Sequence, residues 1–190
     1  MRKAAIALSV LFAAGPALAS VAIGDKLAPF TLKNYDGANV NLASFQGKKA
    51  MVLMFMATQC PVSNAYNERM AAISKEYGAK GVAFVGLNAN KQEPVEEVAE
   101  HAKAHGFPFP ILKDVGNVQA DAFGAQVTPE VYVYDSSWTL RYHGRIDDNQ
   151  RGNNITSPDL RNALDAILAG KEVPAKETKA FGCSIKRVEK

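Results

Sequence analysis

The sequence is poor in cysteine and tryptophan, carries little net charge and contains no long apolar stretch. Its 190 residues include two cysteines and one tryptophan, and the formal net charge at pH 7 is +3. Lysine and arginine do not cluster, which argues against nucleic acids and anionic membrane surfaces as partners. No apolar run reaches the roughly 20 residues that a membrane-spanning helix needs. With no repeats and 47% hydrophobic residues, the chain is predicted to form one globular domain.

The first 19 residues have the pattern of a cleaved secretory signal peptide. Residues 1–3 are cationic, residues 4–14 are apolar, and residues 17–19 provide the small side chains that a signal peptidase requires. We therefore predict cleavage after Ala19 and export of the mature chain to the periplasm. Cleavage would lower the net charge to +1, so most of the apparent basicity belongs to the targeting segment.

The rest of the chain alternates between strand and helix patterns, which predicts an α/β sheet. The runs at 50–57 and 82–88 are apolar on both faces, as in central strands, and the helix between them implies a parallel crossover. The domain is expected to cover residues 20–172, and residues 173–190 form a tail without periodicity. Expected strands cover residues 31–33, 40–42, 50–57, 82–88, 131–134 and 139–143, expected helices cover 62–77, 94–105, 118–123 and 158–169, and an extended connector covers 107–111.

Cys60 lies where a buried strand is predicted to run into a helix. Pro61 follows it and suits the first helical turn, where its missing N–H would have no partner in any case. The partial positive charge at a helix N-terminus stabilises a thiolate, which is the nucleophilic form of cysteine. These features predict a reactive Cys60, with a buried structural cysteine as the alternative. Ser63 stands where a dithiol enzyme has its second cysteine, so a resolving thiol must come from elsewhere.

The order of elements resembles the thioredoxin-like fold, and several motifs resemble the peroxiredoxin-like branch of the redoxin (AhpC/TSA-type) proteins. The resemblance implies a central mixed sheet flanked by helices, with an N-terminal β-hairpin and an extended C-terminal tail. It also implies a thiol-based redox role. The motifs that carry it are TQCPV at 58–62, EYGAKGV at 76–82, GFPFP at 106–110, YHGRIDD at 142–148 and GCSIK at 182–186.

The sequence departs from the peroxiredoxin pattern at two places. Peroxiredoxins have a threonine three residues before the reactive cysteine and a proline four residues before that, where this chain has Ala57 and Leu53. They also have an arginine at the start of the strand that faces the cysteine, where this chain has Thr128 and Pro129. Thioredoxins have a cis Thr-Pro bond there, and its backbone pairs with the incoming substrate strand. The resemblance therefore implies a cis Thr128–Pro129 bond that faces Cys60.

Cys183 lies in the tail after Gly182, which permits a close backbone approach. An even pair of cysteines in an exported protein favours a disulfide, because the compartment oxidises thiols. We expect the tail to fold back so that Cys183 resolves an oxidised Cys60. The alternatives are a structural disulfide, a bond to another subunit, or a free tail thiol.

Four other positions are weaker candidates. Thr58 has the hydroxyl group nearest to Cys60 in the sequence. Glu130 is expected either to accept the proton of an attacking thiol or to be an exposed edge residue. Arg145 either holds the tail and orients substrate or forms a surface ion pair with its acidic neighbours. His101 and His105 are one helical turn apart, but no third metal ligand is near them in the sequence.

We predict an exported thiol-dependent oxidoreductase of the antioxidant type that performs thiol–disulfide exchange or thiol peroxidation. Its partners would be a protein or small-molecule disulfide, or a hydroperoxide, together with a reductant thiol, and it would need no cofactor or metal. The alternative is a non-catalytic thioredoxin-fold binding module or a copper metallochaperone. In the copper site His143 would join Cys60, but Asn64 stands where such chaperones have a second cysteine.

Overall fold

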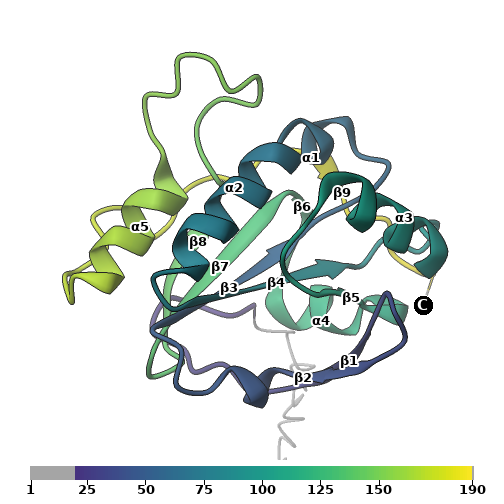
Figure 1. Ribbon diagram of the computed structural model, residues 1–190, viewed down its shortest axis with the longest axis horizontal. Coiled ribbons are helices and arrows are strands. Elements are labelled where there is room, and N and C mark those ends of the chain that lie inside the picture. Colours follow the sequence, from purple (N-terminus) through teal and green to yellow (C-terminus); the bar gives the residue numbers. More distant parts are fainter. Residues whose placement is uncertain (1–19, 190) are drawn as a thin grey trace, which may run out of the picture.

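The computed structural model describes residues 20–189, and the predicted signal peptide lies outside them. A seven-stranded mixed sheet has the order β2-β1-β5-β4-β3-β7-β8, and β6 and β9 form a separate pair (Figure 1). The strands are β1 Thr31–Asn34, β2 Asn39–Asn41, β3 Ala50–Phe55, β4 Val82–Asn88, β5 Ile111–Lys113, β6 Val127–Thr128, β7 Glu130–Asp135, β8 Leu140–Gly144 and β9 Cys183–Ser184.

The two central strands are those with no polar face. Every residue of β3 and β4 is buried, and the two strands are parallel, as predicted. β7 is antiparallel to β3, which makes the sheet mixed, and the predicted N-terminal hairpin is present as β1 and β2. The expected connector at 107–111 is wrong at its end, because β5 begins at Ile111 and pairs with β4. Pro108 and Pro110 have no N–H for a ladder, so the strand begins only after them.

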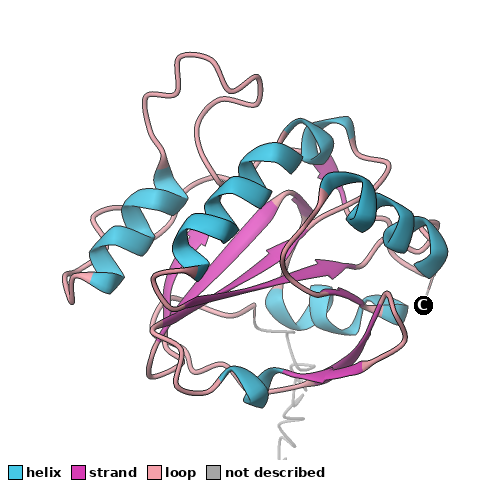
Figure 2. Ribbon diagram, in the orientation of Figure 1, coloured by secondary structure: helices cyan, strands magenta, loops and turns pink. Residues whose placement is uncertain are grey.

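Helices cover both faces of the sheet (Figure 2). Apolar residues of α2, α3 and α5 pack in the core on one face, whereas those of α4 pack on the other. Among the described residues, no helix combines the length and apolar character required to cross a bilayer. The helices are α1 Pro61–Ala65, α2 Asn67–Gly78, α3 Val95–His105, α4 Val118–Phe123 and α5 Asp159–Leu168, with 3-10 turns at Leu42–Phe45 and Val115–Asn117.

The single helix expected at 62–77 is interrupted at Tyr66. The N–H of Tyr66 donates to the Ser63 carbonyl, three residues earlier, and this tight turn ends α1. The Tyr66 carbonyl then accepts the Met70 N–H at the start of α2. The tyrosine ring is 1% exposed, and its hydroxyl donates to the Asp147 carboxylate at 3.0 Å. The apolar spacing of three and four therefore continues through a break in the backbone.

The aperiodic tail is attached to the body of the domain on both sides of Cys183. Before it, the Thr178 N–H donates to the His143 carbonyl at 3.0 Å. After it, the Ile185 N–H donates to the Gln126 carbonyl at 2.9 Å. The tail, yellow in Figure 1, places β9 beside β6 and α1.

Candidate active site

Cys60 begins α1 and is almost completely buried. Its backbone is extended, with φ −87° and ψ 114°, and Pro61 occupies the first helical turn as predicted. The Cys60 Sγ accepts the Ser63 N–H at 3.3 Å and lies 3.4 Å from the Thr128 carbonyl oxygen, to which the thiol can donate. The residue is 3% exposed. A helix N-terminus thus donates directly to the sulfur, the arrangement that favours a thiolate.

Cys183 is brought to Cys60 by strand pairing. β9 is antiparallel to β6, with Cys183 opposite Thr128. Both cysteines are free thiols, and the Thr128 carbonyl, opposite Cys183 in this strand pair, lies 3.4 Å from the Cys60 sulfur. β9 also contacts α1, which Cys60 begins. The pairing therefore places the second cysteine beside the first.

The two thiols have opposite pKa shifts. Burial alone would raise the pKa of Cys60, but the neighbouring Cys183 side chain and the Ser63 amide bring it below its ordinary value. Burial raises the pKa of Cys183, and so does the neighbouring Cys60 sulfur. Of the two thiols, Cys60 is therefore the one that loses its proton more readily.

The Thr128–Pro129 peptide bond is cis, as the resemblance implied. Among the described residues, the buried Thr128 hydroxyl has no hydrogen-bond partner. Gly182 presses against the Thr128 carbonyl, so closely that a β-carbon at position 182 would overlap the carbonyl oxygen. Glycine is therefore required where the tail crosses this loop.

Glu130 holds the loop that carries Thr128. Its carboxylate accepts the backbone N–H groups of Gln126 at 2.8 Å and Val127 at 3.1 Å. Its other oxygen lies 2.6 Å from His143 Nε2 and accepts the Tyr132 hydroxyl at 3.2 Å. Burial opposes ionisation of Glu130, but these donors lower its pKa below the usual value. The alternative of an exposed edge residue is wrong, because Glu130 is 5% exposed.

Glu93 is a buried carboxylate under the loop that precedes Cys60, and the sequence analysis missed it. It is 0% exposed and accepts the backbone N–H groups of Thr58 and Gln59, each at 3.0 Å. The side-chain amides of Asn88 and Asn90 also donate to it. Burial alone would raise the pKa of Glu93, but these donors bring it below its ordinary value. The sequence signal that could have revealed it is a set of polar residues just after a central parallel strand. Functional sites in α/β sheets often lie at the carboxyl ends of such strands.

The same polar network reaches the tail. The Asn90 side-chain oxygen accepts the Lys186 N–H at 2.7 Å, three residues after Cys183. The Lys113 ammonium donates to the Asn88 side chain at 2.6 Å and to the Asn90 carbonyl at 2.7 Å. Burial lowers the pKa of Lys113. The segments that carry the two cysteines are therefore both bound to one group of buried side chains.

Two weaker candidates, Thr58 and Arg145, bind acidic side chains. The Thr58 hydroxyl donates to the Glu97 carboxylate on α3. The Arg145 guanidinium pairs with Asp159 at 2.6 Å, and the Arg145 N–H donates to the Thr178 hydroxyl at 3.1 Å. Arg145 therefore contacts the start of the tail and the start of α5.

In the described part of the chain, no three His, Cys, Asp or Glu side chains form a group that could hold a metal ion. The His101 and His105 rings lie 4.5 Å apart. The His101 Nε2 is within hydrogen-bond distance of the Asn64 and Asn67 side chains. The two histidine rings thus pack against each other, and His101 also contacts side chains of α1 and α2.

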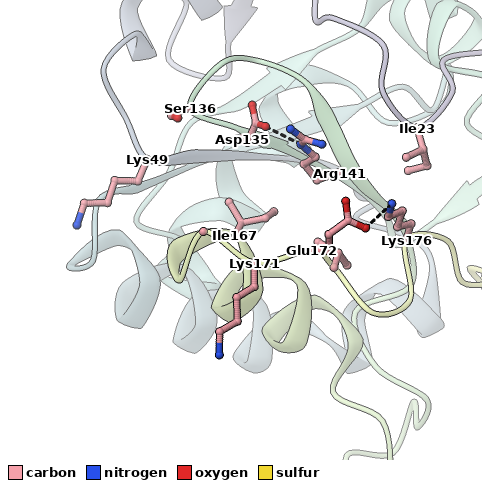
Figure 3. Close-up of a pocket in the computed structure, with 11 residues that line it drawn as sticks. Ile23, Lys49, Asp135, Ser136, Arg141, Ile167, Lys171, Glu172 and Lys176 are labelled. Atoms are coloured by element: carbon pink, nitrogen blue, oxygen red, sulfur yellow. Dashed lines mark hydrogen bonds and ion pairs between the residues drawn. The ribbon is translucent and has the colours of Figure 1, made fainter.

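A cavity of about 320 Å³ lies at the opposite end of the sheet from Cys60. Figure 3 shows the residues that line it. Asp135, at the far end of β7 from Pro129, lines it and pairs with Arg141 at 2.6 Å. Glu172 and Lys176 form a second pair there, at 2.9 Å. Neither cysteine is among the residues that line this cavity.

Two curated relatives are thiol enzymes by name. The chain is 31% identical over 123 residues to the thiol-disulfide oxidoreductase ResA of Halalkalibacterium halodurans, which covers 65% of each protein. It is 29% identical over 130 residues to the chloroplastic peroxiredoxin Q of Gentiana triflora, which covers 65% of this chain and 58% of the relative. The chain thus spans less than two thirds of the length of these two relatives.

Solved structures extend the likeness over nearly the whole chain. A hypothetical protein from Sinorhizobium meliloti is 35% identical with a TM-score of 0.84, covering 90% of this chain and 98% of that one. A thiol:disulfide interchange protein of the thioredoxin family from Chlorobium tepidum, 22% identical, has a TM-score of 0.61 and covers 78% and 99%. The model of the AhpC/TSA family matches residues 23–146. With this match and this topology, the chain belongs to the AhpC/TSA family and has a thioredoxin-like fold.

Proposed function

We propose that the protein is an exported thiol-dependent oxidoreductase in which Cys60 is the nucleophile and Cys183 is the resolving thiol. The observation that carries the proposal is the pairing of β9 with β6, which sets Cys183 opposite Thr128, the residue whose carbonyl lies 3.4 Å from the Cys60 sulfur. A merely structural pair would need no difference between its two sulfurs. Here one thiol has a lowered pKa and the other a raised one.

The first step is the attack of the Cys60 thiolate on an oxidant. With a hydroperoxide, an S–O bond forms as the O–O bond breaks, and the alcohol leaves with a proton from solvent. With a disulfide, a mixed disulfide forms and one substrate thiolate leaves. The lowered pKa of Cys60 supplies the thiolate that either reaction needs.

The second step transfers the oxidation to the cysteine pair. Cys183 loses its proton and its sulfur attacks the Cys60 sulfur, so that an S–S bond forms while water or the second substrate thiol leaves. Two electrons have then passed from the two cysteines to the oxidant. A reductant dithiol, or two small thiols, returns the pair to its starting state. Because β9 already lies against Cys60, this step requires no long movement of the chain.

Export is part of the proposal and rests on the sequence pattern of residues 1–19. An oxidising compartment would supply the disulfides or peroxides that consume the thiols, and it makes an external reductant necessary. Cell fractionation with detection of the mature N-terminus tests this part. Finding the uncleaved chain in the cytosol would contradict it.

The decisive experiment measures turnover of hydrogen peroxide and of a model disulfide by the wild type, Cys60→Ser and Cys183→Ser. We expect Cys60→Ser to be inactive towards both substrates. Cys183→Ser should react once and then accumulate a sulfenic acid or a mixed disulfide, visible by mass spectrometry. If Cys60→Ser keeps both rates, the proposed enzyme is wrong. Two free thiols in the wild type after mild oxidation would rule out Cys183 as the resolving residue.

A further inference from the structure

The backbone edge beside Cys60 is already occupied by the chain itself. β6 is only two residues long, and both residues, Val127 and Thr128, pair with β9. The Thr128 carbonyl also lies 3.4 Å from the Cys60 sulfur. An extended polypeptide that approached Cys60 by adding a strand to this edge would need the same positions. It cannot bind there while β9 is in place.

The tail is held at this edge by contacts that continue on both sides of it. Upstream, Gly144 has no room for a β-carbon because Thr178 of the tail packs against it. Downstream, the Lys186 N–H donates to Asn90, and the Val188 N–H donates to the Asn117 side chain at 2.7 Å. Displacement of β9 would therefore break bonds at more than one point of the tail.

The Cys60 site is buried, in addition to having its neighbouring strand β6 paired with β9. Cys60 is 3% exposed, and Ile185, just after β9, is 5% exposed and packs in the core on the α4 side of the sheet. Cys183 is partly exposed. A molecule of a few atoms needs only a small local opening to reach the Cys60 sulfur, whereas a polypeptide needs the whole strand to leave.

We propose that β9 selects the substrate class: the protein reacts with small oxidants, such as hydroperoxides and low-molecular-weight disulfides, and excludes extended protein disulfides. This inference rests on the proposed function, because it takes Cys60 as the attacking group. The chemistry of the two steps is unchanged. The tail contributes both the resolving thiol and the block on the strand-pairing edge.

The test compares two substrates that differ in chain length and share the same reacting bond. Reduced protein is mixed with 2-hydroxyethyl disulfide or with two unstructured peptides of about ten residues joined by one disulfide. The rate constant for oxidation of Cys60 is measured by acid quench and mass spectrometry. The ratio of the two rate constants cancels any change in the nucleophilicity of Cys60 itself.

Two pairs of variants remove β9 from this edge. Gly182→Val, just before β9, places a side chain against the Thr128 carbonyl and should displace β9 while both cysteines remain. Its control, Ser184→Val, adds the same side chain at an exposed position within β9. A chain that ends at Phe181 lacks β9 and Cys183, and its control is full-length Cys183→Ser, which keeps the strand. Circular dichroism checks that each variant is folded, and the second pair tests the idea if Gly182→Val does not fold.

We expect the peptide disulfide to react about tenfold or more slowly than the small disulfide with the wild type, Ser184→Val and Cys183→Ser. In Gly182→Val and in the chain that ends at Phe181, most of this difference between the two rate constants should disappear. If the wild type accepts both disulfides equally, the inference is wrong while the proposed function stands. If the loss of β9 raised the rate constants for both disulfides by the same factor, selection by strand pairing would also be wrong. Reaction of Cys60→Ser with the small disulfide at the wild-type rate would instead contradict the proposed function.

Discussion

The Glu93 carboxylate accepts the backbone N–H of Gln59, the residue immediately before the reactive cysteine, at 3.0 Å. Its second oxygen accepts the Thr58 N–H at the same distance. A fully buried anion thus fixes two successive peptide groups at the end of β3. The direction in which the chain enters α1, and hence the place of the Cys60 sulfur, depends on it.

We predict that Glu93→Gln destabilises the fold and slows the reaction of Cys60. Glutamine has one acceptor oxygen, so its amide group would face one of the two N–H donors and leave it unsatisfied. Such a loss at a buried site costs about 1–3 kcal/mol. Urea unfolding gives the change in stability, and the rate of iodoacetamide alkylation at pH 7 reports on the thiolate.

The matched control is Glu96→Gln, an exposed residue in the first turn of the neighbouring helix α3. It removes the same charge and should leave the alkylation rate unchanged. Equal effects of the two substitutions would mean that Glu93 acts only through its long-range charge.

The pH dependence of Cys60 alkylation should reveal the contribution of Cys183. In the wild type the midpoint should lie below about 8.5, the ordinary pKa of a free thiol. Cys183→Ala removes the neighbouring side chain that lowers the Cys60 pKa, so the midpoint should move to higher pH. Cys183→Ser keeps a polar side chain and should fall between the two. A midpoint at or above about 8.5 in the wild type would refute an activated Cys60.

Glu130 should make the fold sensitive to acid. Its donors hold the folded-state pKa below the usual value of about 4.3, so its stabilising effect is complete above that pH and is lost as the pH falls through the folded-state pKa. Glu130→Gln should therefore be less stable than the wild type at neutral pH, and the gap should narrow on acidification. Urea unfolding at about pH 7 and about pH 3 measures both differences. A gap of constant size would mean that ionisation of Glu130 is unimportant.

Gly144→Ala should loosen the tail from a position on β8. A β-carbon there would overlap Thr178, at the start of the tail segment that leads to Cys183. We expect faster proteolytic cleavage within residues 176–190 and slower formation of the Cys60–Cys183 disulfide. Gly78→Ala is the control, because position 78 has open space and an ordinary helical backbone. Unchanged cleavage in Gly144→Ala would show that Thr178 can shift without releasing the tail.

The framework of the fold could be predicted because its main signals are local. The apolar runs of β3 and β4, the turn residues of the hairpins and Gly124 after α4 each determine structure within a few residues. Tyr66 was harder to interpret, because the same apolar spacing fits a straight helix and a helix broken by one tight turn. β5 is three residues long and too short for a periodic pattern.

The candidate site was predicted in part. The strand–helix junction predicted the positions of Cys60 and Pro61, and the resemblance to thioredoxins implied the cis Thr128–Pro129 bond. The structure places these residues together. Glu93 and Asn90 could not be found in the same way, because a polar residue after a strand has the same sequence signature whether it is buried or solvated. Their roles depend on contacts with residues far away in the sequence: Gln59 is 34 positions from Glu93, and Lys186 is 96 positions from Asn90.

The attachment of β9 has a consequence for the protein during its synthesis. Ribosomes build the chain from its N-terminus, so Cys60 and the whole sheet are made before the tail that shields them. Until the segment that contains β9 emerges and docks, a newly made molecule has an exposed Cys60 sulfur and an unpaired edge at Thr128. During that interval the protein is most open to unwanted cross-linking with other chains, and the docking of residues 176–189 ends it.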